Sequence, residues 1–345
     1  ATGGTILIMN PRTGEILAMA NYPMFDPDSL TPENMQRARN PAVTDMYEPG
    51  SVFKVLTMAM ALQAGTHDET WTYNDPGCFN PAGSRICNWD GASHGNQTFV
   101  DVFVNSWNTG TTTIFMQMAE QLGGPYAVYD LLKEFGIGSP TGVDLEGEAP
   151  GILPEPGDLD WNEAQYLTTS FGQGVAITPL QMLAATNAIA NDGLIMQPHI
   201  VKMRIDGDQV IETRPAATHR PISAEVARRA RDIMVQIVED PASLDQYEFK
   251  NFKVAGKTGT AQIPIPGGYD PNGSIASFVG FLPADDPVVS VLVKLDRPVN
   301  YWGSMAAAPV FQELVERLVV LMEIPNDSER FQLIAQGGDP FNREY

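Results

Sequence analysis

Apolar residues gather in short runs near the start of the chain and in a longer run soon after. Thr5–Met9 and Glu15–Asn21 are strand-like, and the turn-forming residues between them predict a β-hairpin. Ser51–Ala64 is apolar on nearly every side and is followed by Gly65, which predicts a buried helix that begins at Ser51. The first part of the chain therefore combines a sheet element with a core helix.

The remaining chain separates into a helical middle and a strand-rich last third. Apolar spacing predicts helices over 98–137, 178–191 and 224–238, then strands over 252–255, 276–282 and 288–295, and a final helix over 306–321. Strands at both ends of the chain with helices between them indicate a single sheet built from both termini. The predicted fold class is α+β.

Charge and targeting signals restrict the partners of the protein. With 21 basic and 42 acidic residues, the formal net charge is −21, which repels phosphate backbones and excludes nucleic acid as a partner. No run of 18 apolar residues occurs, and no signal peptide opens the sequence. Because it begins abruptly in core-like sequence, we expect an excised domain with its targeting signal upstream.

The cysteine and histidine residues leave one question open and exclude one kind of site. Cys78 and Cys87 flank a segment rich in glycine, proline and asparagine, and their spacing fits either a small disulfide-closed loop or two free thiols. Neither a CxxC nor an HxxxH pattern occurs, and the four histidines are scattered. The sequence therefore predicts no metal site, and nothing in it requires an organic cofactor.

The start of the buried helix carries the first candidate for chemistry. Ser51 and Lys54 are three residues apart, so they share one helix face. A serine is a poor nucleophile without a nearby base, and a buried lysine loses its proton easily enough to act as one. The pair predicts a serine nucleophile activated by lysine, although a lone SxxK pattern recurs by chance.

Two further motifs follow in the chain. Ser106-Trp107-Asn108 supplies a hydroxyl and an amide at a predicted turn between helices, where alone it would read as a helix cap. Lys257-Thr258-Gly259-Thr260 follows a strand-like run, and its lysine and hydroxyls suit a carboxylate, while Gly259 lets substrate approach the backbone. A phosphate loop is rejected because Asn251 stands where that motif needs glycine.

SxxK, SxN and KTG in this order form the motif set of serine β-lactamases and penicillin-binding proteins. The chain resembles the transpeptidase domain of class B penicillin-binding proteins, and the resemblance extends over residues 1 to about 320. It includes the hairpin region at Asn10–Met19, the nucleophile segment Tyr47–Lys54 and three later segments: Phe171–Gly174 with Thr178–Gln181, Val254–Gln262, and Phe278–Phe281.

The resemblance implies a five-stranded antiparallel sheet flanked by helices, beside an all-helical lobe, with the site between them. It implies a transpeptidase domain over residues 1–324, its α/β lobe formed by roughly 1–65 and 190–324 and its helical lobe by 66–189. Residues 325–345 are expected to be a loosely held tail. Pro264–Ser274, after the KTG motif, is predicted to be a mobile wall of the site.

The same resemblance implies a reaction and a role for each motif residue. Ser51 attacks the D-Ala-D-Ala end of a peptidoglycan stem peptide, with Lys54 as general base and Ser106 relaying the proton to the leaving amine. Asn108 holds the substrate amide, and Lys257, Thr258 and Thr260 bind the terminal carboxylate. Backbone N–H groups of Ser51 and Thr260 form the oxyanion hole. β-Lactams, which mimic this peptide end, are expected to trap Ser51.

The resemblance also implies a location at the outer face of the bacterial cell membrane. There an N-terminal segment absent from this chain would anchor the enzyme and contact a glycan-polymerising membrane partner. Trp107 is bulkier than the expected small residue, so it either packs away from the cleft or narrows it. His94 is a candidate base, although a structural role fits it better.

Three alternative functions remain. A β-lactamase would use the same acyl-enzyme, but the segment Pro154–Glu163 lacks the ExxxN pattern of class A enzymes. A D,D-carboxypeptidase would resolve the same intermediate with water. A catalytically idle β-lactam sensor or scaffold would keep the motifs without turnover on peptide.

Overall fold

The largest sheet of the protein joins strands from the two ends of the chain, as predicted. In the computed structural model, which describes residues 1–240, 249 and 251–341, its strand order is β11-β12-β13-β1-β2, and every neighbouring pair is antiparallel. The strands are β11 (Ala255–Ile265), β12 (Gly268–Leu282), β13 (Val289–Asp296), β1 (Gly3–Met9) and β2 (Ile16–Tyr22). The predicted five-stranded antiparallel sheet is confirmed.

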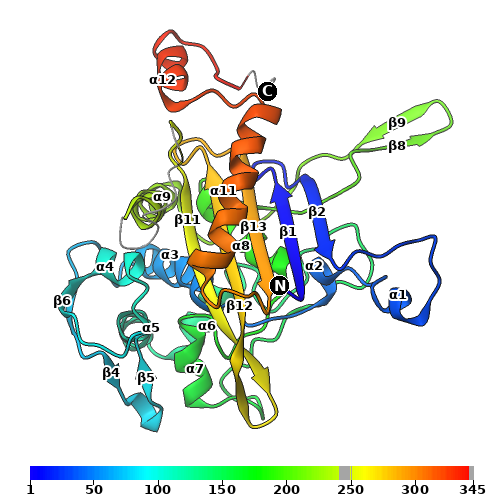
Figure 1. Cartoon of the computed structure of the whole chain (residues 1–345). Coiled ribbons are helices and arrows are strands. Elements are labelled where there is room, and N and C mark those ends of the chain that lie inside the picture. Colours follow the sequence, from blue (N-terminus) through cyan, green and yellow to red (C-terminus); the bar gives the residue numbers. More distant parts are fainter. Residues whose placement is uncertain (241–248, 250, 342–345) are drawn as a thin grey trace.

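Both faces of this sheet are covered, because apolar side chains alternate along its central strands. On one face, Phe278 and Val291 pack with Phe311 of α11 (Gly303–Leu321), and the Phe278 and Phe311 rings lie 4.2 Å apart. On the other face, Phe281 and Leu292 join the larger core beneath the remaining helices. Figure 1 shows α11 crossing the front of the sheet, with α3 and α8 behind it.

The helices follow the predicted segments closely. A 3₁₀ turn at Gly50–Phe53 leads into α3 (Lys54–Ala64), whose residues 54–62 are all buried and whose end is capped by Gly65 in the left-handed conformation. The predicted helical stretch over 98–137 is divided into α4 (Phe99–Val104), α5 (Asn108–Leu122) and α6 (Pro125–Glu134). The helices predicted over 178–191 and 224–238 are α8 (Pro179–Ala190) and α9 (Ala224–Glu239), whereas α7 (Glu163–Thr169) was not predicted.

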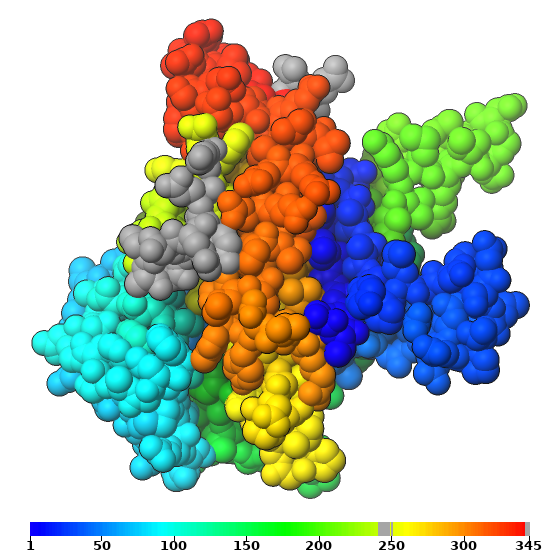
Figure 2. Space-filling model, in the orientation of Figure 1, coloured from blue at the N-terminus to red at the C-terminus, as the bar shows by residue number. Residues whose placement is uncertain are grey.

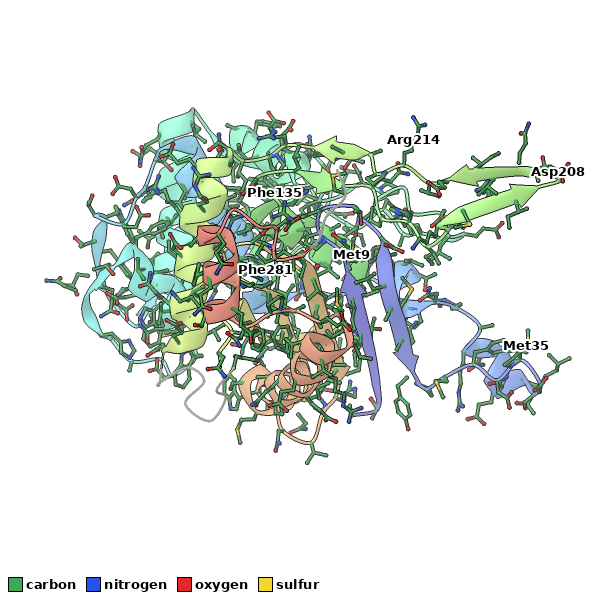
Figure 3. The ribbon with its side chains drawn as sticks, turned by 90° about the horizontal axis from the view of Figure 1, so that it is seen from above. Met9, Met35, Phe135, Asp208, Arg214 and Phe281 are labelled. Atoms are coloured by element: carbon green, nitrogen blue, oxygen red, sulfur yellow. A yellow bond between two sulfur atoms is a disulfide. The ribbon has the colours of Figure 1, made fainter. Side chains whose placement is uncertain are left out.

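Small antiparallel pairs extend from this body. β3 (Thr72–Asp75) pairs with β6 (Gly95–Thr98), β4 (Cys78–Phe79) with β5 (Ile86–Cys87), and β7 (Ile195–Met196) with β10 (Ala217–His219). A hairpin of β8 (Met203–Asp206) and β9 (Gln209–Glu212) projects from the molecule on the same side as α1 (Pro32–Gln36), as Figures 2 and 3 show. The short helix α2 (Pro41–Thr44) and a 3₁₀ turn at Pro81–Gly83 complete the described elements.

Three local predictions were wrong. Residues 252–254 of the predicted strand precede β11 instead of forming it, since β11 begins at Ala255. Pro264–Ser274 is not a separate loop, because β11 and β12 pair as far as Ile265 and Gly268 and turn at the hairpin tip. The segment after Pro325 folds into α12 (Asp327–Ala335), where the fully buried Arg330 donates to Asp285 and Asp327. Residues 342–345 of the predicted tail lie outside the described residues.

In the described parts of the chain, no helix is both long enough and apolar enough to cross a membrane.

Candidate active site

All three motifs meet at one cleft of about 630 Å³ between the sheet and the helical part of the protein. Ser51, Ser106, Asn108, Lys257, Thr258 and Thr260 line the cleft, whereas Lys54 and Gly259 are buried behind its wall. The structure thus brings together every residue that the sequence predicted for the site.

The nucleophile segment is held by close backbone contacts. The Gly50 N–H donates to the Gly172 carbonyl at 2.9 Å. Both glycines have positive φ, and a Cβ added to Gly172 would lie 2.3 Å from the Gly50 oxygen. Val52 and Phe53 are fully buried on the far side of the turn. These contacts fix a 3₁₀ turn that presents a half-buried Ser51 to the cleft.

Lys54 connects the first motif to the second. Its side chain is fully buried, and Nζ lies 2.6 Å from the Ser106 carbonyl oxygen, 3.1 Å from Ser106 Oγ and 2.7 Å from Asn108 Oδ1. Burial, and then the charge of Lys257, hold the pKa of Lys54 well below its ordinary value. Lys54 is therefore far more available as a base than an exposed lysine.

The second motif lies in the connection between α4 and α5. Ser106 has a φ of 60°, in the left-handed region that costs a non-glycine residue roughly 1–2 kcal/mol. This conformation turns the chain so that Asn108 begins α5 beside Lys54. The Asn108 amide nitrogen donates to the Cys87 carbonyl at 2.9 Å, and its oxygen, which accepts from Lys54, keeps a second lone pair.

The third motif lies on the edge strand β11. Lys257 is only 2% exposed, and its Nζ donates to the Thr258 carbonyl at 3.2 Å. Burial lowers the pKa of Lys257 to about 7. The Thr260 Oγ1 accepts from the Gly303 N–H at 2.9 Å, which leaves its own proton available to a ligand.

Gly259 has a packing role on the same strand. A Cβ added at Gly259 would lie 2.5 Å from Ser277 Oγ and 2.8 Å from the Val52 side chain. Glycine therefore lets the nucleophile turn approach β11 closely enough for Ser51 and Lys257 to share one cleft.

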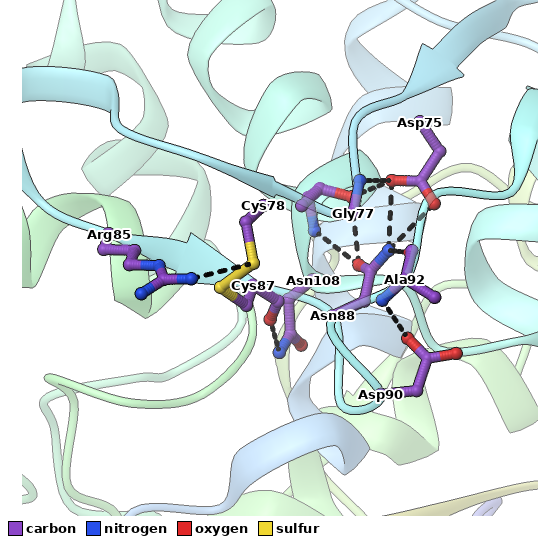
Figure 4. Close-up of a disulfide and its surroundings, with 10 residues drawn as sticks. Asp75, Gly77, Cys78, Arg85, Cys87, Asn88, Asp90, Ala92 and Asn108 are labelled. Atoms are coloured by element: carbon purple, nitrogen blue, oxygen red, sulfur yellow. Dashed lines mark hydrogen bonds between the residues drawn. A yellow bond between two sulfur atoms is a disulfide. The ribbon is translucent and has the colours of Figure 1, made fainter.

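A buried carboxylate supports the helical wall of the cleft. Asp75 is fully buried and accepts from Thr109 at 2.7 Å, from Asn88 at 2.9 Å and from His94 Nδ1 at 2.9 Å. Burial acts to raise the pKa of Asp75, but these hydrogen bonds, with one from Gly77, lower it overall. Figure 4 shows Asp75 with Asn88 and Gly77, beside the segment that carries Cys87 and Asn108. Sequence reasoning did not find Asp75, because only the tertiary structure brings its donors to it.

The disulfide question is settled by the structure, since Cys78 and Cys87 are bonded and the described residues contain no free cysteine. The bond joins β4 to β5, the strand whose Cys87 carbonyl accepts from Asn108 (Figure 4).

Trp107 packs against the helical wall. It is 5% exposed, its ring stacks on His94 at 3.9 Å, and its indole N–H donates to Gln97 at 3.0 Å. The second nitrogen of His94 lies 3.1 Å from Asp90. His94 thus sits between two carboxylates and a ring, which supports its structural role.

Three aromatic residues of the cleft, Trp89, Tyr301 and Trp302, were missed at the sequence level. They lie in turn-rich segments that show no periodic signal. Among the described residues, no group of three or more His, Cys, Asp or Glu side chains is placed so that it could hold a metal ion.

Comparisons with known proteins agree with this geometry. The family model described as the penicillin binding protein transpeptidase domain matches residues 4–316. Stage V sporulation protein D of Bacillus subtilis is 37% identical over 315 residues, which cover 89% of this chain and 48% of that protein. The probable peptidoglycan D,D-transpeptidase PbpC of Pseudomonas aeruginosa is 30% identical over 331 residues, covering 95% of this chain and 55% of the relative.

Solved structures agree as well. Penicillin-binding protein 3 of Mycobacterium tuberculosis, in complex with aztreonam, superposes with a TM-score of 0.84 at 31% identity, covering 94% of this chain and 74% of that one. The chain spans about half the length of the curated relatives it matches.

Proposed function

The chain belongs to the penicillin-binding protein transpeptidase domain family, and from that premise we propose that it is a peptidoglycan D,D-transpeptidase with Ser51 as its nucleophile. The substrate is the D-Ala-D-Ala end of a stem peptide, and β-lactams are covalent inhibitors. The observation that carries this proposal is the buried Lys54 amine, which follows Ser51 by one turn and is bonded to both polar residues of the second motif.

In the first step, Lys54 takes the proton of Ser51 Oγ, and Oγ bonds to the penultimate carbonyl carbon. Burial favours this role because it lowers the pKa of Lys54 and so disfavours the protonated amine. A neutral amine has two N–H donors, which suit the Ser106 carbonyl and Asn108 Oδ1, and one lone pair, which takes the Ser51 proton; once Lys54 holds that proton, Nζ can donate to Ser106 Oγ, 3.1 Å away. This contact gives the proton a route from Lys54 through Ser106 to the leaving D-Ala amine.

The negative charge of the substrate carboxylate is bound by the third motif, on the opposite wall of the cleft. Lys257, with the hydroxyls of Thr258 and Thr260, binds the terminal carboxylate, and that carboxylate in turn favours the protonated form of Lys257. Backbone N–H groups of Ser51 and Thr260 stabilise the oxyanion, each typically by about 3–4 kcal/mol in the transition state. Asn108 holds the peptide amide through its second lone pair.

The acyl-enzyme is resolved by an amine of a neighbouring peptidoglycan strand, whose nitrogen bonds to the acyl carbon as the ester bond to Ser51 breaks.

We further propose that residues 1–324 form the transpeptidase domain. Its α/β lobe consists of roughly residues 1–65 and 190–324, and its helical lobe of roughly residues 66–189. The domain acts at the outer face of the bacterial cell membrane, beside a glycan-polymerising partner that it meets through a portion upstream of this chain.

The test compares the parent with Ser51→Ala and with Ser304→Ala, a matched serine that lines the same cleft but has no proposed catalytic role. Each is incubated with a fluorescent penicillin, and intact mass is followed for hours. A stable one-to-one adduct on the parent and on Ser304→Ala, absent from Ser51→Ala, supports the proposal. An adduct that disappears within seconds indicates a β-lactamase, and no adduct on the parent refutes the assignment.

A second measurement separates an enzyme from a sensor. Release of D-Ala from a peptide ending in D-Ala-D-Ala is expected from the parent, whereas acylation by penicillin without any D-Ala release indicates an idle domain.

A further inference from the structure

Two exposed indole rings meet across the mouth of the cleft. Trp89, which follows the disulfide-closed β4–β5 pair, is 60% exposed, and Trp302, directly before α11, is 42% exposed. Their ring centres lie 6.0 Å apart in an edge-to-face arrangement. We call this pair the aromatic arch. Exposed aromatic side chains inside a ligand cleft mark a binding surface, because burying them would release water from a large apolar area.

The arch connects the two sides of the proposed chemistry. On one wall, Trp302 adjoins the carboxylate-binding motif, because the neighbouring Gly303 N–H donates to Thr260. On the other wall, Trp89 stacks on Trp107 at 6.2 Å, and Trp107 directly follows Ser106. The arch therefore extends from the motif that binds the carboxylate of the terminal D-Ala to Ser106, which relays the proton to the amine of that D-Ala.

The position of the arch indicates which part of the substrate it contacts. The acyl portion of the donor peptide and its leaving group extend in opposite directions from the scissile carbonyl, and the arch lies with the leaving group. Once D-Ala has left, the attacking amine must enter at the vacated position, since Ser106 and Lys54 must accept the proton that they earlier delivered.

We propose that the aromatic arch is the acceptor subsite, where Trp89 and Trp302 bind the amine-bearing side chain of the second stem peptide. This inference rests on the proposed transpeptidase function. The methylene groups of such a side chain pack on the indole rings, and its ammonium group is attracted to the ring faces before it loses its proton to solvent. The free amine then bonds to the acyl carbon, the carbon–oxygen bond to Ser51 breaks, and the amine's second proton returns to Oγ through Ser106 and Lys54.

The test measures how the acyl-enzyme is partitioned. A donor peptide ending in D-Ala-D-Ala is supplied with the tripeptide L-Ala-γ-D-Glu-L-Lys as acceptor, and mass spectrometry gives the ratio of cross-linked to hydrolysed product. Trp89→Leu and Trp302→Leu remove one ring each while keeping an apolar side chain. Tyr126→Leu is the matched control, because Tyr126 is 58% exposed and does not line the cleft.

We expect each arch variant to lower the cross-linking ratio about tenfold, and the double variant to lower it by little more than either single change, because the two rings act as one unit. Tyr126→Leu leaves the ratio unchanged, and Trp89→Phe, which retains a ring, restores at least half of it. In each arch variant, the fold-decrease in the cross-linking ratio should be at least five times any fold-decrease in the rate of acylation by penicillin.

An unchanged ratio in both single variants overturns the proposal. An equal loss in acylation and in the ratio also overturns it, because the arch would then act on the donor. A variant that fails to unfold cooperatively on heating is replaced by the other single variant, so the test stays decisive. Failure of the transpeptidase function itself is recognised separately, since the parent would then form no adduct at Ser51, release no D-Ala or give no cross-linked product.

Discussion

Replacing Lys257 by methionine should change how the stability of the protein depends on pH. Lys257 is 2% exposed, and burial lowers its pKa to about 7 from an ordinary value of 10.5. The unfolded chain keeps this lysine protonated up to about pH 10.5, whereas the folded protein releases the proton above about pH 7. Between these values the unfolded state binds one proton more than the folded state.

The sign and size of the effect follow from this difference. An extra proton on the unfolded state makes the free energy of unfolding rise with pH, by about 1.4 kcal/mol per pH unit. Across the window from about pH 7 to pH 10.5, the buried lysine accounts for roughly 5 kcal/mol of stability that is absent at low pH. Methionine has a similar length and no charge, so the variant lacks this slope and should be the more stable protein at pH 6.5.

Urea unfolding of the parent and of Lys257→Met at pH 6.5, 7.5, 8.5 and 9.5 measures the effect. The stability advantage of the variant should shrink by about 1.4 kcal/mol for each pH unit above pH 7.5. Parallel curves would refute the reasoning, because they would mean that Lys257 has the same pKa in the folded and unfolded states. A variant that is less stable at pH 6.5 would show that the charged lysine is well compensated in the folded protein.

Two further changes test the site and its support. Lys54→Met removes the proposed base while keeping the side-chain volume, so the acylation rate with penicillin in stopped-flow measurements should fall about 10²–10⁴-fold; a variant that retains more than a tenth of the parental rate would exclude Lys54 as the base. Asp75→Ala leaves buried donors from Asn88 and Thr109 without their acceptor, so urea unfolding should show a loss of about 3 kcal/mol or more; a cost below about 1 kcal/mol would contradict the role assigned to this network.

Local sequence signals determined the elements and the identity of the motifs. The start of the helix at Thr178-Pro179 and the end of the helix at Gly65 depend only on neighbouring residues. Both positions could therefore be predicted from the sequence. The strand-like runs near both ends of the chain likewise predicted one sheet built from both termini. The three motifs were recognisable because each consists of a few adjacent residues whose side chains suggest its chemical role.

The tertiary structure alone decided how those motifs act on one another. Lys54 reaches Asn108 across 54 positions of sequence, and the low pKa of Lys257 arises from surrounding residues that no local pattern specifies. Whether Cys78 and Cys87 pair depended on the distance between two backbones, which spacing does not give. The contact of Trp89 with Trp302 arises in the same way, because it joins segments more than 200 residues apart that carry no signal of their own. Packing, burial and electrostatic coupling depend on proximity in space, and only the folded chain supplies it.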